Sequence, residues 1–208
     1  MVVPDVADRR VQLTPAETVR IGALASGGGR TVINIAHACA RGEIPAIVAV
    51  CVVTRADAGA VARCQSHGIP VAVVEPEPAE TFDDRVDAAL RAYDVNFVCL
   101  AGYLRRFRVG GADAWKGRAL NIHPALLPEF GGQGMYGERV HRAVLEAGST
   151  ESGCTVHWVD DVYDNGKHVV QRRCPVLPGD SAEALAARVF QEECLAYPEA
   201  LRQVLGGG

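Results

Sequence analysis

The sequence predicts an α/β fold: a doubly wound, Rossmann-like, mostly parallel sheet with helices on both faces, ended by a C-terminal strand pair and a long final helix. Apolar runs of strand length alternate with helically spaced apolar residues between residues 19 and 124. Those runs are apolar on both faces, as strands of a parallel sheet are when helices cover both sides. After residue 150 the alternation stops, which indicates a different ending to the sheet.

In the first half of this alternation, two helical segments separate three runs that are rich in apolar and β-branched residues. The first helical pattern ends near Gly42, and Gly68 closes the second, as glycine commonly does at the end of a helix. The expected strands are 19–25, 46–53 and 69–75, and the expected helices are 31–43 and 57–67.

The second half continues the pattern with one more helix and two more strands. Phe82, Val86, Ala89 and Leu90 share one face of an amphipathic helix. The expected elements are a helix at 81–93 and strands at 95–103 and 119–124.

The C-terminal part has a different rhythm. Segments 153–161 and 168–177 predict a strand pair around a long turn, and an apolar stripe predicts a helix over 181–205. Asp180 and Glu183 have the spacing of an N-terminal capping box for that helix.

Length and composition favour one domain. The chain has 208 residues, of which 49% are hydrophobic, so it can bury a full core. Its first residues mix charges and prolines without an apolar stretch, so a signal peptide is not expected. We expect residues 1–18 to be a flexible leader and residues 19–208 to form a single domain.

Charge and cysteine usage bear on partners and compartment. The net charge of −4 argues against a nucleic-acid partner, and no apolar run approaches the roughly 20 residues that cross a bilayer. The seven cysteines are widely spaced and form no CxxC pair. We therefore expect reduced thiols, no structural metal and a cytoplasmic location. The expected assembly is a monomer or homodimer, a choice that the sequence does not make.

Three consecutive glycines lie between the first expected strand and the first expected helix, in ASGGGRT. The backbone N–H groups of Gly27, Gly28 and Gly29 can approach an anion closely, and the helix N-terminus adds partial positive charge. The loop has neither the GxGxxG nor the Walker pattern, so it predicts one phosphate rather than a dinucleotide or triphosphate. Arg30 adds charge there. The alternative is a tight strand-to-helix turn without a ligand.

Two polar residues interrupt the apolar strand NIHPALLP (121–128). In an extended segment Asn121 and His123 project to the same side, near the sheet edge at which open α/β folds bind ligands. Neither is a good nucleophile here, but an amide and an imidazole can stabilise an oxyanion and move protons. The pair therefore predicts acyl transfer, and a satisfied pair of buried polar groups is the alternative.

A carboxylate would orient this imidazole and raise its pKa. The turn WVDDVYDNGKH offers Asp160, Asp161 and Asp164. Their spacing does not choose among them.

Four segments together resemble the folate-dependent formyltransferase family: SGGGRT, LAGYLRRF (100–107), NIHPALLP and GCTVHWVDDVYDNG. The resemblance covers residues 19–205. It implies the formyltransferase version of the α/β fold. It also implies direct transfer of a formyl group from 10-formyltetrahydrofolate, as co-substrate, to a substrate amine without a metal.

The resemblance also assigns residues. Asn121, His123 and Asp164 match the family's catalytic residues, which selects among the three aspartates. It also implies binding residues. The substrate phosphate would be bound by Gly27, Gly28, Gly29, Arg30 and Thr31, and the rest of a ribonucleotide substrate would be contacted by Glu193. The folate would be bound by Leu104, Arg105, Phe107, Asp160 and Asp161.

The sequence departs from the family pattern in three places. GGGRT replaces the usual GNGSN, so side-chain contacts from that Asn and Ser are absent and Arg30 could substitute. Lys167 replaces a proline after the DxG turn. The loop at 129–143 is longer and richer in glycine than in many relatives. His141 in that loop matches a position near the substrate, and His157 is expected to pack and to orient its strand.

Within the family, length and the phosphate loop favour members that formylate glycinamide ribonucleotide. Hydrolases of formyltetrahydrofolate carry an extra N-terminal domain, and enzymes that formylate initiator methionyl-tRNA carry a basic C-terminal one. Sugar-nucleotide formyltransferases usually continue further too. A non-catalytic folate- or nucleotide-binding module is the alternative from another class.

Overall fold

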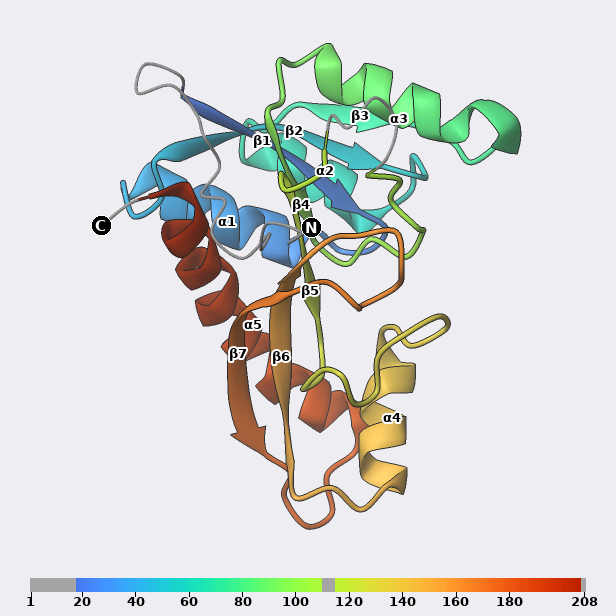
Figure 1. Ribbon diagram of the computed structural model, residues 1–208, viewed down its shortest axis with the longest axis vertical. Coiled ribbons are helices and arrows are strands. Elements are labelled where there is room, and N and C mark those ends of the chain that lie inside the picture. Colours follow the sequence, from blue (N-terminus) through green and yellow to red (C-terminus); the bar gives the residue numbers. More distant parts are fainter. Residues whose placement is uncertain (1–17, 110–114, 207–208) are drawn as a thin grey trace, which may run out of the picture.

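The computed structural model describes residues 18–109 and 115–206 of the chain. Its strands are β1 (Val19–Ala25), β2 (Ala46–Val53), β3 (Val71–Val73), β4 (Phe97–Leu100), β5 (Ala119–His123), β6 (Glu151–Trp158) and β7 (His168–Pro175). They form one sheet in the order β3-β2-β1-β4-β5-β6-β7 (Figure 1). In this order the five strands β3, β2, β1, β4 and β5 pair in parallel. Strand β6 pairs antiparallel with β5 on one side and with β7 on the other. The predicted fold class is confirmed.

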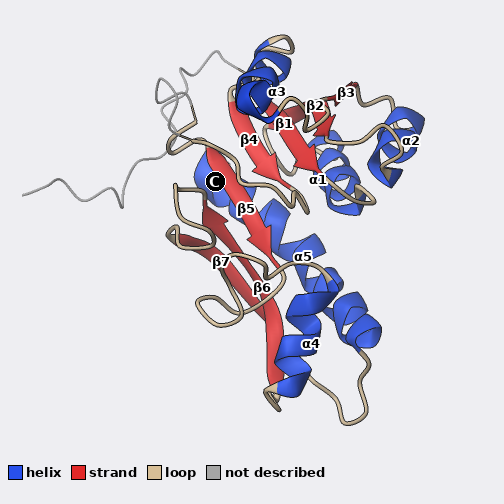
Figure 2. Ribbon diagram, turned by 90° about the vertical axis from the view of Figure 1, so that its right-hand side faces the viewer, coloured by secondary structure: helices blue, strands red, loops and turns tan. Residues whose placement is uncertain are grey.

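Helices cover both faces of this sheet (Figure 2). They are α1 (Arg30–Ala40), α2 (Gly59–Ser66), the short 3-10 helix η2 (Ala79–Thr81), α3 (Phe82–Arg91), α4 (Glu138–Glu146) and α5 (Ala182–Leu205). Leu24 of β1 packs into the core beneath α3, whereas its neighbours Ala23 and Ala25 pack beneath α1 and α2. This alternation between two cores is why the parallel strands are apolar on both faces.

The long helix α5 lies on the same face as α1 and extends over the antiparallel end of the sheet. Leu185, Val189 and Leu201 of α5 share a core with Leu120 and Ile122 of β5. The opposite face of β5 therefore remains for polar side chains.

Two details of the C-terminal part differ from expectation. Residues 138–146, expected to belong largely to a glycine-rich loop, form α4, because Val140 and Val144 are buried one turn apart. The cap of α5 is Ser181, whose Oγ accepts a hydrogen bond from the Ala184 N–H at 3.2 Å. Asp180, the expected cap, accepts from Arg188 Nη1 at 2.6 Å instead.

The fourth strand is also shorter than expected. It ends at Leu100 rather than at 103, and Gly102, with φ of 74°, turns the chain away from the sheet. Segment 104–107 is thereby released from the sheet toward the ligand edge.

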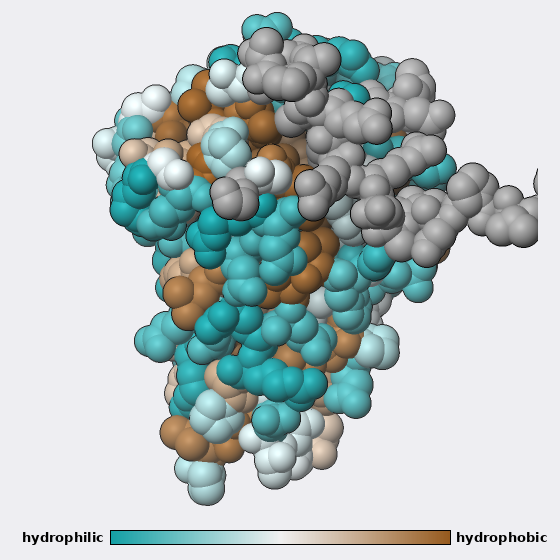
Figure 3. Space-filling view, turned by 60° about the vertical axis from the view of Figure 1, so that its left-hand side comes forward, coloured by the Kyte–Doolittle hydropathy of each residue, from teal (hydrophilic) through white to brown (hydrophobic). Residues whose placement is uncertain are grey.

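The face drawn in Figure 3 is mixed: hydrophilic side chains cover much of its middle and lower part, and apolar side chains reach the surface between them. Within the described ranges, no helix combines the length and apolarity needed to cross a membrane. Residues 1–17 of the expected leader and residues 207–208 lie outside the described residues, so the boundaries 1–18 and 19–208 stay predictions.

Candidate active site

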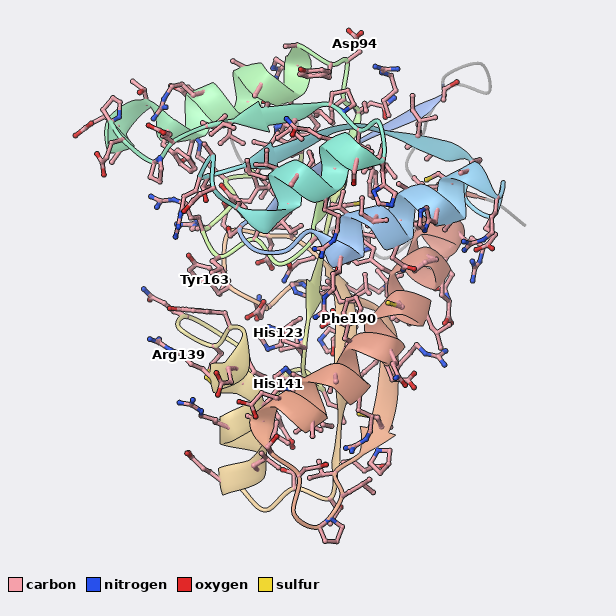
Figure 4. The ribbon with its side chains drawn as sticks, turned by 180° about the vertical axis from the view of Figure 1, so that it is seen from behind. Asp94, His123, Arg139, His141, Tyr163 and Phe190 are labelled. Atoms are coloured by element: carbon pink, nitrogen blue, oxygen red, sulfur yellow. The ribbon has the colours of Figure 1, made fainter. Side chains whose placement is uncertain are left out.

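A pocket of about 970 Å³ lies at the C-terminal ends of β1, β4 and β5. This is the edge at which open α/β sheets bind ligands, and the volume suits small molecules. Side chains from α4, α5 and the turn after β6 complete its wall. In Figure 4, His123, His141 and Phe190 gather near the middle of the molecule, while Tyr163 and Arg139 lie at its margin.

Pairing between β5 and β6 sets the spacing of the polar side chains in this pocket. Asn121 lies opposite His157, and His123 lies opposite Thr155, in antiparallel register. Ile122 points into the core beneath α5. Asn121 and His123 therefore share the other face, as strand alternation predicts.

Thr155 anchors the proline-rich loop that follows β5. Its hydroxyl donates to the Ala125 carbonyl at 2.7 Å and accepts from the Leu127 N–H at 3.1 Å. Gln171 of β7 donates to the Leu127 carbonyl at 3.0 Å. Because Thr155 is fully buried, these bonds hold the loop firmly against the antiparallel strands.

The turn after β6 brings Asp164 back over β5. Asp164 has φ of 53°, a left-handed conformation that aspartate tolerates better than most side chains. A Cβ on Gly166 would overlap the carbonyl of Trp158, so the DxG spacing reflects a close approach of turn and strand. The Gly132 N–H donates to Asp164 Oδ2 at 2.9 Å. Both the turn and the glycine-rich loop thus fix this carboxylate.

The structure brings Asn121, His123 and Asp164 together. His123 Nδ1 lies 3.4 Å from Asp164 Oδ2, and Asn121 Nδ2 donates to Asp164 Oδ1 at 3.3 Å. The other ring nitrogen, Nε2, lies 2.8 Å from the Phe130 carbonyl, which assigns it a proton. An amide, an imidazole and a carboxylate therefore meet at one point of the pocket wall.

His157 is a fourth member of this cluster. Its Nε2 lies 3.1 Å from Asn121 Nδ2 and 3.5 Å from Asp164 Oδ1, and its Nδ1 donates to the Trp158 carbonyl at 2.8 Å. Sequence reasoning assigned it packing and strand orientation alone. The feature that reveals its role is the antiparallel register of β5 and β6, which sets His157 opposite Asn121 and which the sequence alone does not show.

Burial and charge set the protonation of the cluster. Burial lowers the pKa of His123 below its ordinary value, although the Asp164 carboxylate and the Phe130 carbonyl oppose this. Burial acts to raise the pKa of Asp164, but the hydrogen bond with His157 and the charge of His123 outweigh it and lower that pKa. Burial thus favours the neutral form of His123, whereas the neighbours of Asp164 favour its ionised form. Negative charge developing next to His123 favours its protonation.

The glycine loop is pressed against α2. The Ala60 N–H donates to the Gly27 carbonyl at 3.0 Å, and Arg63 donates to the Gly28 carbonyl. Gly29, the N-cap of α1, has φ of 71° and supplies no side-chain acceptor to the first N–H groups of the helix. Those groups face the pocket with the partial positive charge of the helix end.

Replacing Gly29 with alanine should damage both the fold and this end of the pocket. A positive φ costs a non-glycine residue about 1–2 kcal/mol, and the new Cβ would also lie 2.8 Å from the Ala60 Cβ. Gly42→Ala is the matched control, because Gly42 has φ of 73° with open space around it. We expect the larger loss of Tm for Gly29→Ala in thermal denaturation. Equal losses would contradict the packing argument.

Arg30 and Thr31 follow the glycines into α1, and both line the pocket. The Arg30 guanidinium carbon lies 3.9 Å from the centre of the Phe190 ring on α5, within cation–π range. Glu193, one turn further along α5, lines the same end. Burial raises the pKa of Glu193 to about 7, although the charge of Arg30 opposes this. Its carboxyl group therefore changes charge near neutral pH.

Segment 104–107 lines the other part of the wall through Leu104, Arg105 and Phe107. The Leu104 N–H donates to Ser26 Oγ at 3.0 Å, which ties the segment to the glycine loop. The Arg105 guanidinium lies 4.6 Å from the centre of the Phe82 ring. These contacts hold the segment in place.

The remaining aspartates of the turn differ in position. Asp160 lines the pocket, and its carboxylate accepts from the Val162 N–H at 2.9 Å. Asp161 lies outside the lining, and its carbonyl accepts from Arg106 Nη2 at 2.7 Å. Lys167, which replaces the family's proline, accepts a hydrogen bond from the Trp158 N–H at 3.0 Å through its carbonyl.

His141 of α4 lines the pocket near His123. It is 5% exposed, and its Nδ1 has no hydrogen-bond partner among the described residues. Burial, and then the charge of His123, lower its pKa. Across the described part of the chain no group of three or more His, Cys, Asp and Glu residues is placed to hold a metal ion, and all seven cysteines are free thiols.

Comparison with known proteins agrees with this geometry. Phosphoribosylglycinamide formyltransferase, chloroplastic, of Arabidopsis thaliana is 42% identical over 185 residues, which are 86% of this chain and 63% of that protein. Phosphoribosylglycinamide formyltransferase of Haemophilus influenzae is 35% identical over 182 residues, 86% of this chain and 84% of that protein. The crystal structure of glycinamide ribonucleotide transformylase 1 from Symbiobacterium toebii superposes with a TM-score of 0.84 at 40% identity, and covers 91% of this chain and 89% of that one.

The chain thus spans less than two thirds of the Arabidopsis relative and most of the two bacterial ones. The formyl transferase family model matches residues 19–201, from the first strand into the last helix. Since that match includes every element that lines the pocket, the chain belongs to the formyl transferase family.

Proposed function

We propose that this chain transfers the formyl group of 10-formyltetrahydrofolate to the amine of glycinamide ribonucleotide, giving N-formylglycinamide ribonucleotide and tetrahydrofolate in purine biosynthesis. The observation that carries the proposal is the cluster of Asn121, His123 and Asp164 in one pocket with the glycine loop and segment 104–107. Relatives from a plant and a bacterium carry the name of this activity.

The reaction begins when the neutral amine attacks the formyl carbon. The carbonyl oxygen becomes an oxyanion, and the new C–N bond leaves a positive charge on the attacking nitrogen. Protonated His123 and an N–H of Asn121 stabilise the oxyanion, and preorganised donors of this kind are worth about 3–4 kcal/mol each. The Asn121 amide already donates to Asp164 and lies against His157, and the His123 Nε2–H already donates to the Phe130 carbonyl. The oxyanion must therefore compete for one N–H group of each side chain.

The second half of the reaction is proton transfer followed by cleavage. The attacking nitrogen loses a proton, and the folate nitrogen gains one before its C–N bond breaks. Asp164, acting through a water molecule, is the group that relays this proton, because its carboxylate stays ionised in the site. As the oxyanion collapses to the carbonyl, His123 returns to water the proton that it took up from water when the oxyanion formed.

The remaining residues of the pocket wall bind the parts of the two substrates that do not react. Gly27, Gly28 and Gly29, with Arg30 and Thr31, bind the phosphate of the ribonucleotide. Glu193 contacts the same substrate. The folate lies against Leu104, Arg105, Phe107 and Asp160, and against the backbone of the turn that contains Asp161.

An assay of formyl transfer tests the proposal. Purified protein should consume 10-formyltetrahydrofolate and release tetrahydrofolate when glycinamide ribonucleotide is present, and should do neither without the amine. Equal consumption with and without the amine would identify a hydrolase. Binding of both ligands without turnover would identify a non-catalytic binding protein.

Arg30→Ala should raise the KM for glycinamide ribonucleotide about tenfold and leave the KM for the folate donor unchanged. The guanidinium is held at the phosphate end by the Phe190 ring, and a charge-assisted contact contributes about 1.5–3 kcal/mol. Arg41→Ala is the control, since Arg41 is exposed at the other end of α1 and pairs with Glu43. Steady-state kinetics with each substrate varied in turn would separate the two KM values. An unchanged KM for the ribonucleotide would show that backbone N–H groups alone bind the phosphate.

The proposed partners are small molecules, with neither nucleic acid nor membrane as a partner, and the proposed assembly is a monomer or homodimer. The cytoplasm is the proposed compartment, because seven free thiols suit a reducing environment.

A further inference from the structure

A proline inside the last helix leaves one backbone carbonyl without its helical donor. Pro198 lies within α5 and has no N–H to offer the carbonyl four residues earlier, which belongs to Cys194. That carbonyl accepts a hydrogen bond from Asn34 Nδ2 at 2.8 Å. Asn34 is on α1, 160 residues away in sequence. The carbonyl that Pro198 leaves without a donor in α5 is therefore hydrogen-bonded by a side chain of α1.

The cation–π contact of Arg30 with Phe190 accompanies the Asn34 bond between α1 and α5. Arg30 and Asn34 are four residues apart, so they lie one above the other on α1. Their partners, Phe190 and Cys194, have the same spacing on α5. Arg30 packs on the Phe190 ring and Asn34 binds the Cys194 carbonyl, and the two helices are therefore matched turn for turn.

This contact lies beside the pocket. Helix α1 begins directly after the glycine loop, and Glu193 is the residue next to Cys194 and lines the pocket. The bond from Asn34 fixes the Cys194 carbonyl and therefore the backbone that carries the Glu193 side chain. Phe190 of α5, labelled in Figure 4, contacts Arg30 at the start of α1.

The apolar contacts between these helices do not depend on the bond. Ile35 and Ala38 of α1 are buried in one core with Tyr197 and Leu201 of α5. Loss of the hydrogen bond should therefore leave the helices packed and allow the Glu193 segment to shift locally.

We propose that Asn34 is a positioning residue: its bond to the carbonyl freed by Pro198 holds Glu193 at a fixed distance from the glycine loop, and so sets how the phosphorylated amine binds. The inference rests on the proposed function, because that function places the phosphate on the loop and the rest of the ribonucleotide against Glu193. Asn34 itself contacts no reacting atom.

Asn34→Leu tests this role, because leucine has nearly the shape of asparagine without its donor. The KM for glycinamide ribonucleotide should rise about five- to tenfold, as loss of one aligned hydrogen bond allows. The KM for the folate donor and kcat at saturation should change less than about twofold. An unchanged KM for the ribonucleotide would overturn the proposal.

Asn96→Leu is the matched control. Asn96 also bonds backbone groups, accepting from the Arg20 N–H at 2.8 Å and donating to the Thr18 carbonyl at 3.3 Å, but it lies outside the pocket. It should lower the Tm and leave both KM values at those of the parent. A raised KM for the ribonucleotide in this variant as well would show general destabilisation and would overturn the proposal.

A second substitution separates positioning from simple satisfaction of the carbonyl. Pro198→Ala restores a backbone N–H that can donate to Cys194 within α5. The double variant Asn34→Leu/Pro198→Ala should recover the Tm lost by Asn34→Leu, while its KM for the ribonucleotide stays raised because α1 and α5 remain unlinked. Recovery of both quantities would show that Asn34 only satisfies the carbonyl, and would overturn the positioning role.

A measurement that needs no catalytic turnover tests the role of Asn34 independently of the proposed function. The ¹³C signal of the Glu193 carboxyl group should titrate near pH 7 in the parent. In Asn34→Leu the midpoint should move to higher pH, because the carboxyl group moves away from the charge of Arg30. If the parent formylates nothing, the proposed function fails, and this titration decides the inference alone. Identical midpoints would overturn it.

Discussion

Asp164→Asn should lower kcat about a thousandfold while leaving affinity for the folate donor nearly intact. The substitution keeps the shape of the side chain and removes its charge. In the parent, Asp164 accepts from the Gly132 N–H and the Asn121 amide and faces His123 and His157. An amide at this position has one acceptor oxygen for these neighbours, and its NH2 group faces other donors. Neither stabilisation of the imidazolium nor proton relay survives.

Asp94→Asn is the matched control for this experiment. Asp94 has the same φ of 53° as Asp164, and it lies outside the pocket, at the upper edge of the molecule in Figure 4. The two variants undergo the same chemical change in the same backbone conformation. We expect parental kcat for Asp94→Asn in steady-state assays and parental Kd for the folate donor in both. A parental kcat for Asp164→Asn would remove this carboxylate from the mechanism.

His123→Gln should lower kcat at least a hundredfold, within the range that a general acid–base group contributes, about 10²–10⁴. Glutamine still offers an N–H to the oxyanion, but it cannot become a cation. The pKa of His123 is lowered by burial, so the parent gains its positive charge only as the oxyanion forms, and the variant cannot. The pH dependence of kcat that arises from this group should vanish along with the rate.

His37→Gln controls for the loss of an imidazole. His37 is exposed on α1, away from the pocket, and its ring contacts His67. It should keep the kcat and the pH profile of the parent. A His123→Gln enzyme with full activity and an unaltered profile would show that oxyanion stabilisation comes from Asn121 and the backbone.

The class of fold was predictable because hydrophobic alternation records which faces of a strand are buried. β1 and β2 are covered by helices on both sides, and their sequences are apolar except for Arg20 near the start of β1. Helix α4 was missed because its short apolar face follows a run of glycines that predicts a loop. The end of β4 was misplaced because Gly102 stops the strand inside an apolar run, where hydrophobicity alone carries no boundary.

The candidate site was predictable only in part from its residues. Strand alternation places Asn121 and His123 on one face, but the choice among three aspartates depends on how the turn folds back, and the resemblance supplied it. In the structure the same turn aims Asp164 at His123, sets Asp160 on the pocket wall and leaves Asp161 outside. His157 escaped because its role arises from cross-strand register, which one sequence does not reveal.

The register between β5 and β6 has a consequence for how this gene can change. Inserting or deleting one codon within β5 would invert the parity of the strand, so Asn121 and His123 would turn toward α5 and their apolar neighbours would turn into the pocket. A two-codon change would keep the parity but shift which residues face Thr155 and His157. Point substitutions can therefore tune this part of the chain gradually, whereas length changes there abolish the site in one step. Length variation among working descendants should be confined to the loops outside these two strands.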